Sequence, residues 1–377
     1  MNHMRILQTS FYNPFLNEGG GVEQVIYNLS KGLCIKGHKV DITCVGNKNE
    51  VIKTKFGNLY IFKVSEFKLF GKLGIFLRKA MYNNKLKKFI NKSGSDYDII
   101  HVHGDIGGFR ELGRFNTLLT LHGFSIQTHE NRNLLDKMFI KATSGRTEIA
   151  NMKYSKKVVA VSNRVKSFAS KYTKNKIEVL HNGVDTTIYI PLSDLEKLQL
   201  RHKLGFKDGA TYLLFVGGDA YRKGLDIAID ALKLFGRNNI YLNIVGISKQ
   251  NRNNPKIIKF IGRVSELEKI KYYQASDIFI LPSRGEGLAL APLEAMSCGL
   301  PIIVSKYVGV NGIISNGREG IIVSQNKPES YYNAVKSLLQ NETFRKVKTA
   351  VVQLAKKNDY KYMATKYFKL YKTVMGD

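Results

Sequence analysis

The two halves of this 377-residue chain open with the same local pattern, and this repeat limits the possible folds more than any other feature. Residues 4–8 form a short apolar run, followed by a glycine-containing loop and a segment of helical period. The same succession starts again at residues 212–216. Short apolar strands that alternate with helices are typical of a parallel sheet covered on both faces. The sequence therefore predicts an α/β chain built from two similar doubly wound domains.

The same pattern predicts where the elements and the domain boundary lie. Expected strands are residues 4–8, 38–45, 98–103, 117–121 and 157–161, and then 212–216, 241–245, 257–261, 277–281, 301–304 and 320–323. Expected helices are residues 22–33, a segment opened by the capping box at Ser193, a segment after Gly224, and the stretch from Glu342 to Gly376. Because regularity lapses over residues 185–193, we expect domains of residues 1–190 and 191–359, with helix 360–377 packing back on the first domain.

Composition excludes several classes of protein. With 44% apolar residues the chain can bury proper cores, unlike a disordered basic protein. No run approaches the roughly 18 apolar residues of a spanning helix, and the start lacks the features of a secretory leader. The cysteines Cys34, Cys44 and Cys298 form no CxxC pair. We therefore expect a cytoplasmic protein without a disulfide framework or a structural zinc site.

The net charge of +29 is compatible with three kinds of partner: nucleic acid, an anionic membrane surface and phosphorylated substrates. The excess is densest over residues 53–92, where 11 Lys and Arg side chains face the single acid Glu66. A solvated surface of lysine-rich composition is the alternative explanation for the global charge.

Residues 283–304 carry the most chemical information. A glycine-flanked acid, Glu286, follows an expected buried strand, and a helix is expected to start near Pro292 with Glu294 on its first turn. The backbone N–H groups at this helix start, from Ala289 and Leu290, are suited to a phosphate. Two carboxylates beside a phosphate would repel it, so we expect them to contact neutral groups, with sugar hydroxyls the obvious choice.

The spacing of these two acids resembles the E-x7-E motif of retaining family 4 glycosyltransferases with the GT-B fold. The resemblance extends over nearly the whole chain, through the N-terminal Gly-rich loop, DIIHVH at residues 98–103, TLHG at 120–123, VSN at 161–163, HNGVD at 181–185 and RKG at 222–224. It implies two facing Rossmann-like domains with a ligand cleft between them, the first binding the acceptor and the second a nucleotide-sugar donor.

The resemblance also implies roles for individual residues. Glu294 would hold the ribose hydroxyls of the donor, Glu286 would be the acid near the transferred sugar, and Arg222 and Lys223 would clamp the donor diphosphate. Many family members read Gly-Arg where this chain has residues 217–218, so Arg222 takes the place of the usual arginine in this assignment. Residues 283–304, which carry the motif, contain no Asp-x-Asp pair, and we expect no metal ion and no cofactor beyond the nucleotide sugar itself.

Further residues match the family by position. Gly19, Gly20 and Gly21 resemble its glycine loop, with a simple turn before a helix as the alternative. His122 matches a histidine that approaches the donor sugar, and Gly262 and Val264 resemble the loop against the nucleobase. His101 and His103 alternate on one strand, and we interpret them as a structural pair because no further metal ligands follow at suitable spacing.

The basic stretch of residues 53–92 mixes Lys and Arg with Phe, Leu and Ile in a way that fits an interfacial amphipathic element. We expect it to contact an anionic membrane surface or the acceptor, which would make the protein peripheral on the inner face of the membrane. The alternative is a helix that packs its apolar residues on the sheet and exposes a solvated face.

The function predicted is that of a retaining hexosyltransferase. It would move a sugar from a UDP- or GDP-sugar to a lipid-linked or cell-envelope glycan, such as lipopolysaccharide or polysaccharide, without a metal. One alternative is a GT-B nucleotide-sugar epimerase. The other is a basic nucleic-acid-binding protein, which is disfavoured because the chain has no zinc, helix-turn-helix or aromatic-basic RNA motif; we therefore expect no nucleic-acid partner.

Overall fold

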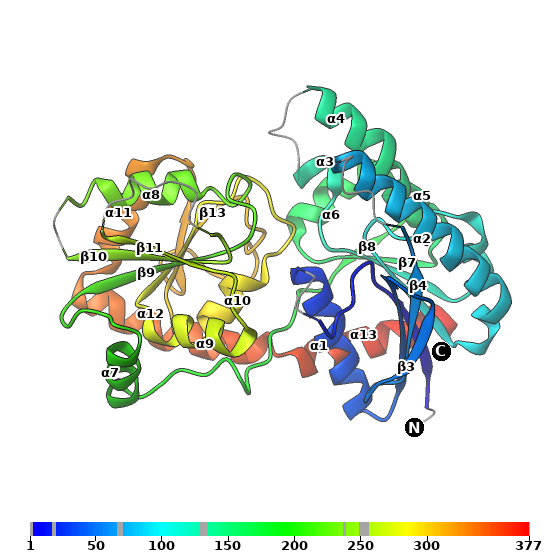
Figure 1. The fold of residues 1–377 in the computed structure, drawn as a ribbon, viewed down its shortest axis with the longest axis horizontal. Coiled ribbons are helices and arrows are strands. Elements are labelled where there is room, and N and C mark those ends of the chain that lie inside the picture. The colour runs from blue at the N-terminus through cyan, green and yellow to red at the C-terminus, as the bar shows by residue number, and fades with distance from the viewer. Residues whose placement is uncertain are drawn as a thin grey trace. The chain divides into compact units, whose positions relative to one another are not determined.

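The computed structural model describes residues 3–16, 20–65, 71–128, 134–236, 239–248 and 256–376. These residues form two compact units (Figure 1). Unit 1 comprises residues 1–183 and 360–377, and unit 2 comprises residues 184–359. The first unit therefore ends slightly before the boundary expected at residue 190, and it includes the C-terminal helix.

Unit 1 contains an eight-stranded sheet in the order β3-β4-β2-β1-β5-β6-β7-β8, in which only the edge strand β3 runs antiparallel to its neighbour. Its strands are β1 (Arg5–Thr9), β2 (Lys39–Gly46), β3 (Glu50–Lys53), β4 (Asn58–Lys63), β5 (Ile99–His103), β6 (Thr117–Leu121), β7 (Lys157–Ala160) and β8 (Ile177–Val179). Its helices are α1 (Gly21–Ile35), α2 (Gly71–Ser93), α3 (Ser125–Thr128), α4 (Leu134–Ile140), α5 (Arg146–Tyr154), α6 (Asn163–Ala169) and α13 (Tyr360–Met375).

Unit 2 contains a six-stranded parallel sheet in the order β11-β10-β9-β12-β13-β14. Its strands are β9 (Thr211–Val216), β10 (Ile240–Val245), β11 (Ile258–Gly262), β12 (Ile278–Leu281), β13 (Ile302–Ser305) and β14 (Gly320–Val323). Its helices are α7 (Asp194–Lys203), α8 (Leu225–Lys233), α9 (Glu266–Ala275), α10 (Leu290–Ser297), α11 (Pro328–Leu338) and α12 (Asn341–Lys357). Helices α8 and α11 lie on one face of the sheet, and α9, α10 and α12 lie on the other (Figure 1).

The two units repeat one topology, which confirms the prediction of two similar doubly wound folds. In unit 1 the second strand lies on one side of β1 and the chain then crosses to β5 on the other side. Unit 2 does the same, with β10 on one side of β9 and β12 on the other. Such a reversal of strand order creates a ligand-binding position at the carboxyl ends of the two central strands. Each unit therefore has one such position, at β1/β5 and at β9/β12.

The elements expected from periodicity are present, and the structure adds strands that were not expected, among them β3, β4 and β8. Strand β4 lies within residues 53–92, which we expected to form an amphipathic element, and its partner β3 ends at Lys53, where that stretch begins. Helix α10 begins at Leu290, two residues before Pro292, because a first-turn residue needs no intrahelical N–H partner. The long C-terminal helix is interrupted at residues 358–359, where Asp359 pairs with Val184.

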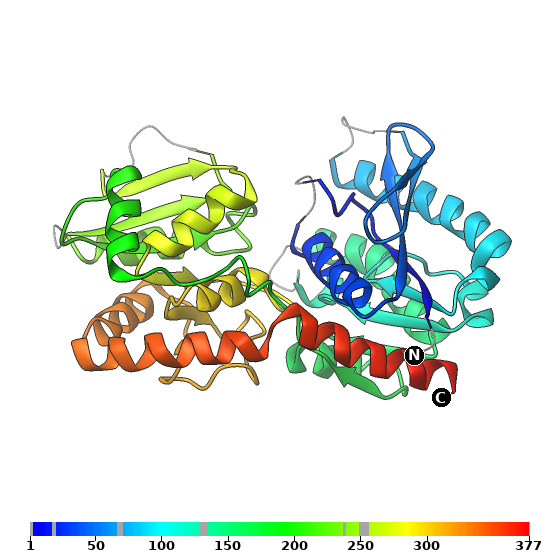
Figure 2. The same cartoon turned by 90° about the horizontal axis from the view of Figure 1, so that it is seen from below.

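Helix α13 runs along unit 1 (red in Figure 2) and buries one face there. It packs against α1, where a Cβ on Gly32 would lie 2.5 Å from the Cβ of Ala364. Its Tyr367 and Tyr371 are almost fully buried and reach the sheet, where their hydroxyls bond Thr120 and His101. None of the helices in the described ranges is both long enough and apolar enough to cross a bilayer.

Candidate active site

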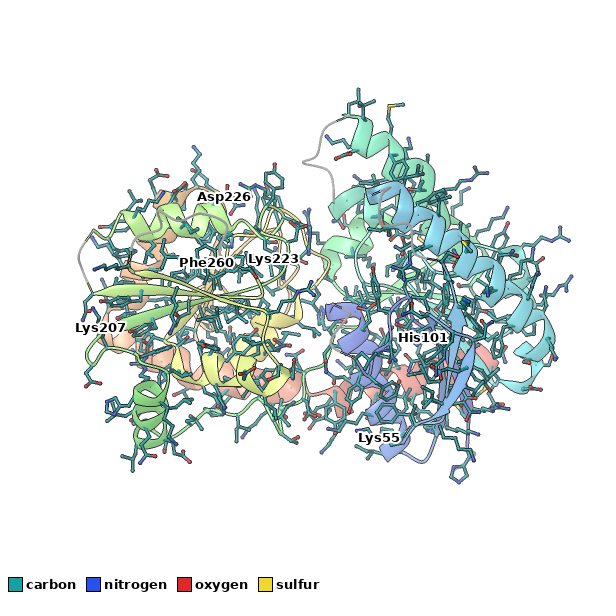
Figure 3. The ribbon with its side chains drawn as sticks, viewed as in Figure 1. Lys55, His101, Lys207, Lys223, Asp226 and Phe260 are labelled. Carbon is teal, nitrogen blue, oxygen red and sulfur yellow. The ribbon has the colours of Figure 1, made fainter. Side chains whose placement is uncertain are left out.

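The carboxyl ends of β9 and β12 in unit 2 bring together three residues singled out by the sequence. Arg222 and Lys223 follow β9, and Glu286 follows β12. One Glu286 oxygen, Oε1, lies 2.7 Å from Arg222 Nη1 and 3.5 Å from Lys223 Nζ. The ion pairs therefore lie at the point where the strand order of unit 2 reverses, and Figure 3 labels Lys223 there.

Glu286 is held as a carboxylate. Burial opposes its ionisation, but the charges of Lys223 and Arg222 outweigh burial and hold the pKa of the Glu286 carboxyl below its usual value. Ser283 Oγ donates a further hydrogen bond to Oε1 at 3.2 Å. The site thus presents an acid that accepts hydrogen bonds and does not donate a proton at neutral pH.

The two cations differ in how many carboxylates compensate them. Arg222 Nε also lies 3.3 Å from Asp219 Oδ2, so that Arg222 pairs with two acids. Lys223 pairs with Glu286 alone among the described residues. Of the two, Lys223 therefore retains more positive charge to offer an anionic ligand.

Two glycines make the position of Lys223 possible. A Cβ on Gly217, at the end of β9, would lie 2.0 Å from Lys223 Cδ. Gly224 has a φ of +73°, and a Cβ there would lie 2.0 Å from the Pro282 carbonyl oxygen. Glycine is the residue that fits both constraints. Many family members have Gly-Arg where this chain has Gly217 and Gly218. In this chain the side chain of Lys223 lies against Gly217.

Glu294, the second acid of the motif, lies on α10 and is 4% exposed. Its Oε1 is 3.2 Å from Lys269 Nζ, and Tyr273 donates a hydrogen bond to its Oε2 at 2.8 Å. Lys269 also pairs with Glu266, 3.0 Å away on the same helix α9.

The expectation that both acids contact neutral groups of a ligand stays a prediction, and the contacts that they make within the protein are of two kinds. Glu286 and Glu294 each contact a lysine, because a buried carboxylate needs a compensating charge. Each also accepts a neutral hydroxyl hydrogen bond, from Ser283 and Tyr273 respectively. A carboxylate has about four acceptor positions, so these contacts leave capacity for a ligand.

The start of α10 has the polarity expected of an anion site. Ala289 occupies the N-cap position and provides no side-chain hydrogen bond to the first turn, and Leu290 is the first helical residue. Both are nearly buried, at 7% exposure. The first-turn N–H groups of a helix carry a partial positive charge, which is strongest where no side chain caps them.

The remaining residues predicted for the donor lie along the same edge of the sheet. Gly262 ends β11 with a φ of +81°, and its carbonyl accepts a hydrogen bond of 2.7 Å from the Gly246 N–H at the end of β10. Val264 follows two residues later and precedes Ser265, the N-cap residue of α9. The structure thus places all seven donor residues of the prediction within unit 2.

In unit 1, the predicted His122 follows β6 and Gly21 opens α1. Gly20 is the N-cap residue of α1, and its N–H donates to Glu23 Oε2 at 2.7 Å. Gly19 lies outside the described residues. The glycine loop therefore ends as a helix N-terminus, which is also what the alternative of a simple turn predicts.

His122 is half-buried and belongs to a cluster of three imidazoles, of which the other two, His101 and His103, are buried. His122 Nε2 is 2.8 Å from His103 Nδ1, and the two rings are stacked with centroids 5.1 Å apart. His101 lies beside them and bonds Tyr371 and Thr120, each at 2.8 Å. Burial lowers the pKa of His122 to about 4, and lowers the pKa of His101 and His103 well below the usual value. All three rings are therefore neutral at pH 7.

Within the described residues, no group of three His, Cys, Asp or Glu side chains is arranged to hold a metal ion. His101 is fully buried, and both its ring nitrogens are hydrogen-bonded within the core; its structural role stays a prediction. His103 differs, because it connects the core to His122 at the carboxyl edge of the sheet.

Helix α2, which lies in the basic stretch of residues 53–92, has two parts that differ in burial. Helix α2 buries Tyr82, Leu86 and Ile90 against the sheet, as the alternative interpretation predicted. Its first turns are different, since Leu73 and Ile75 are 44% and 48% exposed.

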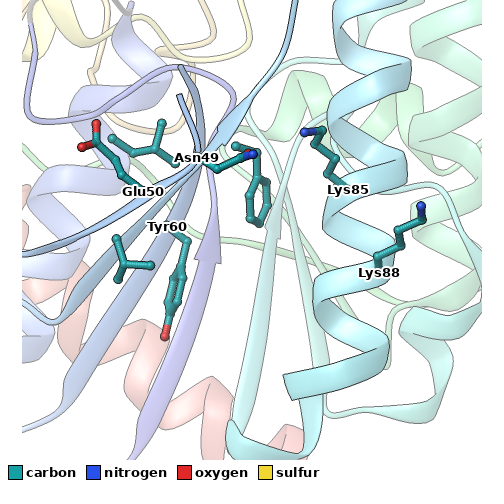
Figure 4. A pocket seen from close by; sticks show the side chains of 8 residues that line it. Asn49, Glu50, Tyr60, Lys85 and Lys88 are labelled. Carbon is teal, nitrogen blue, oxygen red and sulfur yellow. The ribbon is translucent and has the colours of Figure 1, made fainter. Parts of the chain in front are cut away.

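A surface pocket of about 420 Å³ lies between α2 and the β3–β4 hairpin (Figure 4). Tyr60 and Phe62 contribute apolar surface from β4, and Lys85 and Lys88 extend from α2.

Sequence reasoning missed the partners of the predicted site residues. Lys269 and Tyr273 contact Glu294, Asp219 contacts Arg222, and His103 contacts His122. The capping box at Ser265, which begins α9, was the available signal for a helix carrying Lys269 and Tyr273 toward α10.

Two family models match the chain. The model for glycosyltransferase family 4 matches residues 19–188, and the model for glycosyl transferases group 1 matches residues 196–357. The chain belongs to the family 4 glycosyltransferases with the GT-B fold. The two matches meet near the boundary between unit 1 and unit 2.

Individual relatives and structures agree with this family. A glycosyltransferase of Methanocaldococcus jannaschii, itself uncharacterised, is 26% identical over 91% of this chain and 90% of its own length. The UDP-Gal:alpha-D-GlcNAc-diphosphoundecaprenol alpha-1,3-galactosyltransferase of Escherichia coli is 29% identical over 63% of this chain and 65% of its own. The sucrose-phosphate synthase structure from Thermosynechococcus elongatus has a TM-score of 0.82 at 18% identity, covering 99% of this chain and all of that one.

Proposed function

We propose that this family 4 glycosyltransferase transfers a hexose, with retention of anomeric configuration, from a UDP- or GDP-sugar to a lipid-linked or cell-envelope glycan. The observation that carries the proposal is the cluster of Arg222, Lys223 and Glu286 at the strand reversal of unit 2. Ligands of open α/β sheets bind at such a position, and cations there suit a diphosphate.

The donor would be bound by unit 2 through groups of matched charge. Its diphosphate takes Lys223, Arg222 and the first-turn N–H groups of α10, while Glu294 accepts hydrogen bonds from the ribose hydroxyls. Departure of the nucleoside diphosphate leaves negative charge, and these preorganised cations and dipoles stabilise it without a metal ion. Glu286, held as a carboxylate, accepts hydrogen bonds from the transferred sugar, which His122 also contacts.

The acceptor proposal rests on the galactosyltransferase relative, whose name specifies a lipid diphosphate acceptor. We test donor and acceptor together by incubating the purified chain with a panel of UDP- and GDP-sugars and a short-chain lipid diphosphate sugar. Release of UDP or GDP that depends on the acceptor, with an α-anomeric product from an α-linked donor, is expected. An inverted product would exclude retention, and loss of turnover in chelator would exclude metal independence.

The epimerase alternative is separated by the same experiment. An epimerase would change the configuration of the sugar without transferring it to the lipid acceptor. NMR of the soluble and lipid fractions distinguishes these products. Transfer to the lipid fraction is the result that we expect.

We also propose that unit 1 contacts an anionic membrane, through a surface that combines the start of α2, within the predicted residues 53–92, with α4, which lies outside them. Three apolar residues of α4 are strongly exposed, Leu134, Leu135 and Met138, at 71%, 79% and 61%. The rings of Phe76 on α2 and Phe139 on α4 lie 6.1 Å apart, so that the exposed start of α2 adjoins α4. Exposed apolar side chains flanked by lysines favour a membrane surface.

Flotation with phosphatidylglycerol vesicles at low salt tests this surface. The double substitution Leu134→Ser and Leu135→Ser should release the protein, whereas Leu267→Ser should not, since Leu267 is equally exposed, at 72%, on unit 2. Equal flotation of all three proteins would count against the proposal.

A further inference from the structure

A buried chain of hydrogen bonds runs from helix α1 to His122. Ser30 Oγ donates to the Ile26 carbonyl at 2.8 Å, and Gln8 Nε2 donates to Ser30 Oγ at 3.0 Å. Gln8 Oε1 lies 2.9 Å from His103 Nε2, and His103 Nδ1 lies 2.8 Å from His122 Nε2. Gln8 and Ser30 are fully buried and His103 is 3% exposed, so water does not replace these partners.

Each hydrogen bond in this series has a defined donor and acceptor, so the series as a whole has a direction. Because Ser30 uses its hydroxyl hydrogen on Ile26, its oxygen accepts from the amide nitrogen of Gln8. The Gln8 carbonyl oxygen then faces His103 Nε2, which must carry the hydrogen. A neutral imidazole has one N–H, so His103 Nδ1 is an acceptor.

The last link sets the state of His122. Since His103 Nδ1 accepts, His122 Nε2 must donate, and the hydrogen of this neutral ring is placed on Nε2. Nδ1 is left as a lone pair. His122 is only half-buried, and no hydrogen bond joins its Nδ1 to another described residue.

The neighbouring imidazole does not disturb this order. His101 lies 4.0 Å from His103 between ring centroids, but its own nitrogens are occupied by Tyr371 and Thr120. Both nitrogens of His103 are therefore used by Gln8 and His122. Burial keeps these rings neutral, as their lowered pKa values indicate.

We infer that Gln8, Ser30 and His103 are positioning residues that fix His122 as its Nε2–H tautomer, so that Nδ1 accepts a hydrogen bond from a hydroxyl of the transferred sugar. The sugar contact rests on the proposed function, whereas the tautomer does not. A ring locked as an acceptor discriminates against a sugar that lacks a hydroxyl at the contacted position, because the analogue leaves Nδ1 unpaired.

The tautomer is tested without a donor. ¹⁵N-histidine NMR of the full chain at pH 7 should show His122 protonated on Nε2. Gln8→Met removes the acceptor for His103 at similar volume, and it should bring a substantial Nδ1–H population at His122. A wild-type His122 protonated on Nδ1, or a tautomer unchanged in Gln8→Met, overturns the inference whether or not the protein transfers sugar.

The sugar contact is tested with deoxyfluoro donor analogues. We expect the wild type to prefer the native donor over one analogue by about tenfold in kcat/KM, a preference that Gln8→Met should lose while its affinity for UDP or GDP stays unchanged. Ser30→Ala is a milder second variant that should reduce the preference in the same direction. An equal loss for native and analogue donors would assign Gln8 a merely structural role and overturn the contact.

Thr43→Val is the matched control. Thr43 lies on β2 of the same sheet, is fully buried, and shares a 2.7 Å hydrogen bond with Tyr82 rather than with this chain. It should lower the melting temperature as Gln8→Met does, but leave the His122 tautomer and the analogue preference as in the wild type. A changed tautomer in Thr43→Val would show that the His122 tautomer responds to any destabilisation of the sheet and does not depend on Gln8 in particular.

Discussion

The two units repeat one topology but use opposite chemistry at their strand reversals. In unit 2, Arg222, Lys223 and Glu286 form a cluster of full charges within hydrogen-bond or ion-pair distance. In unit 1, Gln8, His103 and His122 form a cluster that is neutral at pH 7. The difference shows that one fold supplies the position of a site, while the local side chains decide whether it suits an anion or a hydroxyl.

The largest effect is expected from removing the less compensated cation of the charged cluster. Lys223→Ala should lower kcat by about 100-fold to 1,000-fold, because the leaving diphosphate loses a stabilising charge. Release of UDP or GDP measures this. Lys233→Ala is the control, since Lys233 is exposed on α8 and pairs only with Asp230 among the described residues. Equal activity of the two variants would remove Lys223 from the site.

The second acid of the motif should act on binding rather than turnover. Glu294→Gln keeps the volume but removes the charge that faces Lys269, and we expect nucleoside diphosphate affinity to fall by about tenfold to 100-fold. Calorimetric titration with UDP and GDP measures it. The control Glu268→Gln changes an exposed capping residue of α9. Undiminished affinity in Glu294→Gln would mean that the ribose is bound elsewhere.

Glu148 extends the comparison between the neutral groups of unit 1 and the charged groups of unit 2. It is a carboxyl group of unit 1 that is expected to stay protonated in the folded protein at pH 7. It is 3% exposed and accepts hydrogen bonds from the N–H and hydroxyl of Ser125, yet burial and the charge of Asp105 raise its pKa from 4.5 to about 8. Between these two pH values only the folded chain holds the proton. The free energy of unfolding should therefore fall as pH rises through this range, by at most about 1.4 kcal/mol per pH unit.

Glu148→Gln should remove that slope. Denaturant titrations of both proteins from pH 5 to pH 8, an interval of about three units, measure the difference between them. Glu178→Gln is the control, because Glu178 is partly exposed on β8, where it pairs with Lys157. A difference between wild type and Glu148→Gln that is constant with pH would show that Glu148 is ionised throughout.

The smallest effect is expected from a charged pair of unit 2 that lies outside the cluster. Arg284 pairs with Asp226 at 2.5 Å, but the Asp226 side chain is 56% exposed (labelled in Figure 3). Asp226→Asn should change the free energy of unfolding by less than about 1 kcal/mol and leave nucleotide affinity unchanged. Thermal unfolding and titration check both. A large loss of affinity would extend the charged site to Arg284.

Much of the fold could be predicted because it depends on local patterns. The capping box at Ser193 begins α7 as expected, with Ser193 Oγ accepting from the Glu196 N–H. Apolar runs such as residues 212–216 gave the central strands, since a strand buried on both faces is continuously apolar. The hairpin β3–β4 was missed, because its exposed edge strand lacks that signal.

The candidate site was predictable by position but not by contact. Glu286 and Lys223 could be assigned from motifs in the sequence. The ion pair between them joins two loops that lie close together only because β9 and β12 are adjacent in the sheet. The same holds for Lys269 and Glu294, which lie on different helices.

The sequence alone determined the alternation of strands and helices, the repeat of one topology and the positions of the two motif acids, because each is recorded in the period or spacing of neighbouring residues. Only the tertiary structure decided that Gln8 orients His103, and that His103 in turn faces His122. It also decided that Tyr371 and Tyr367 of α13, a helix already expected to pack on the first domain, bond His101 and Thr120. Donor and acceptor directions depend on atoms from distant strands, and no local pattern specifies them.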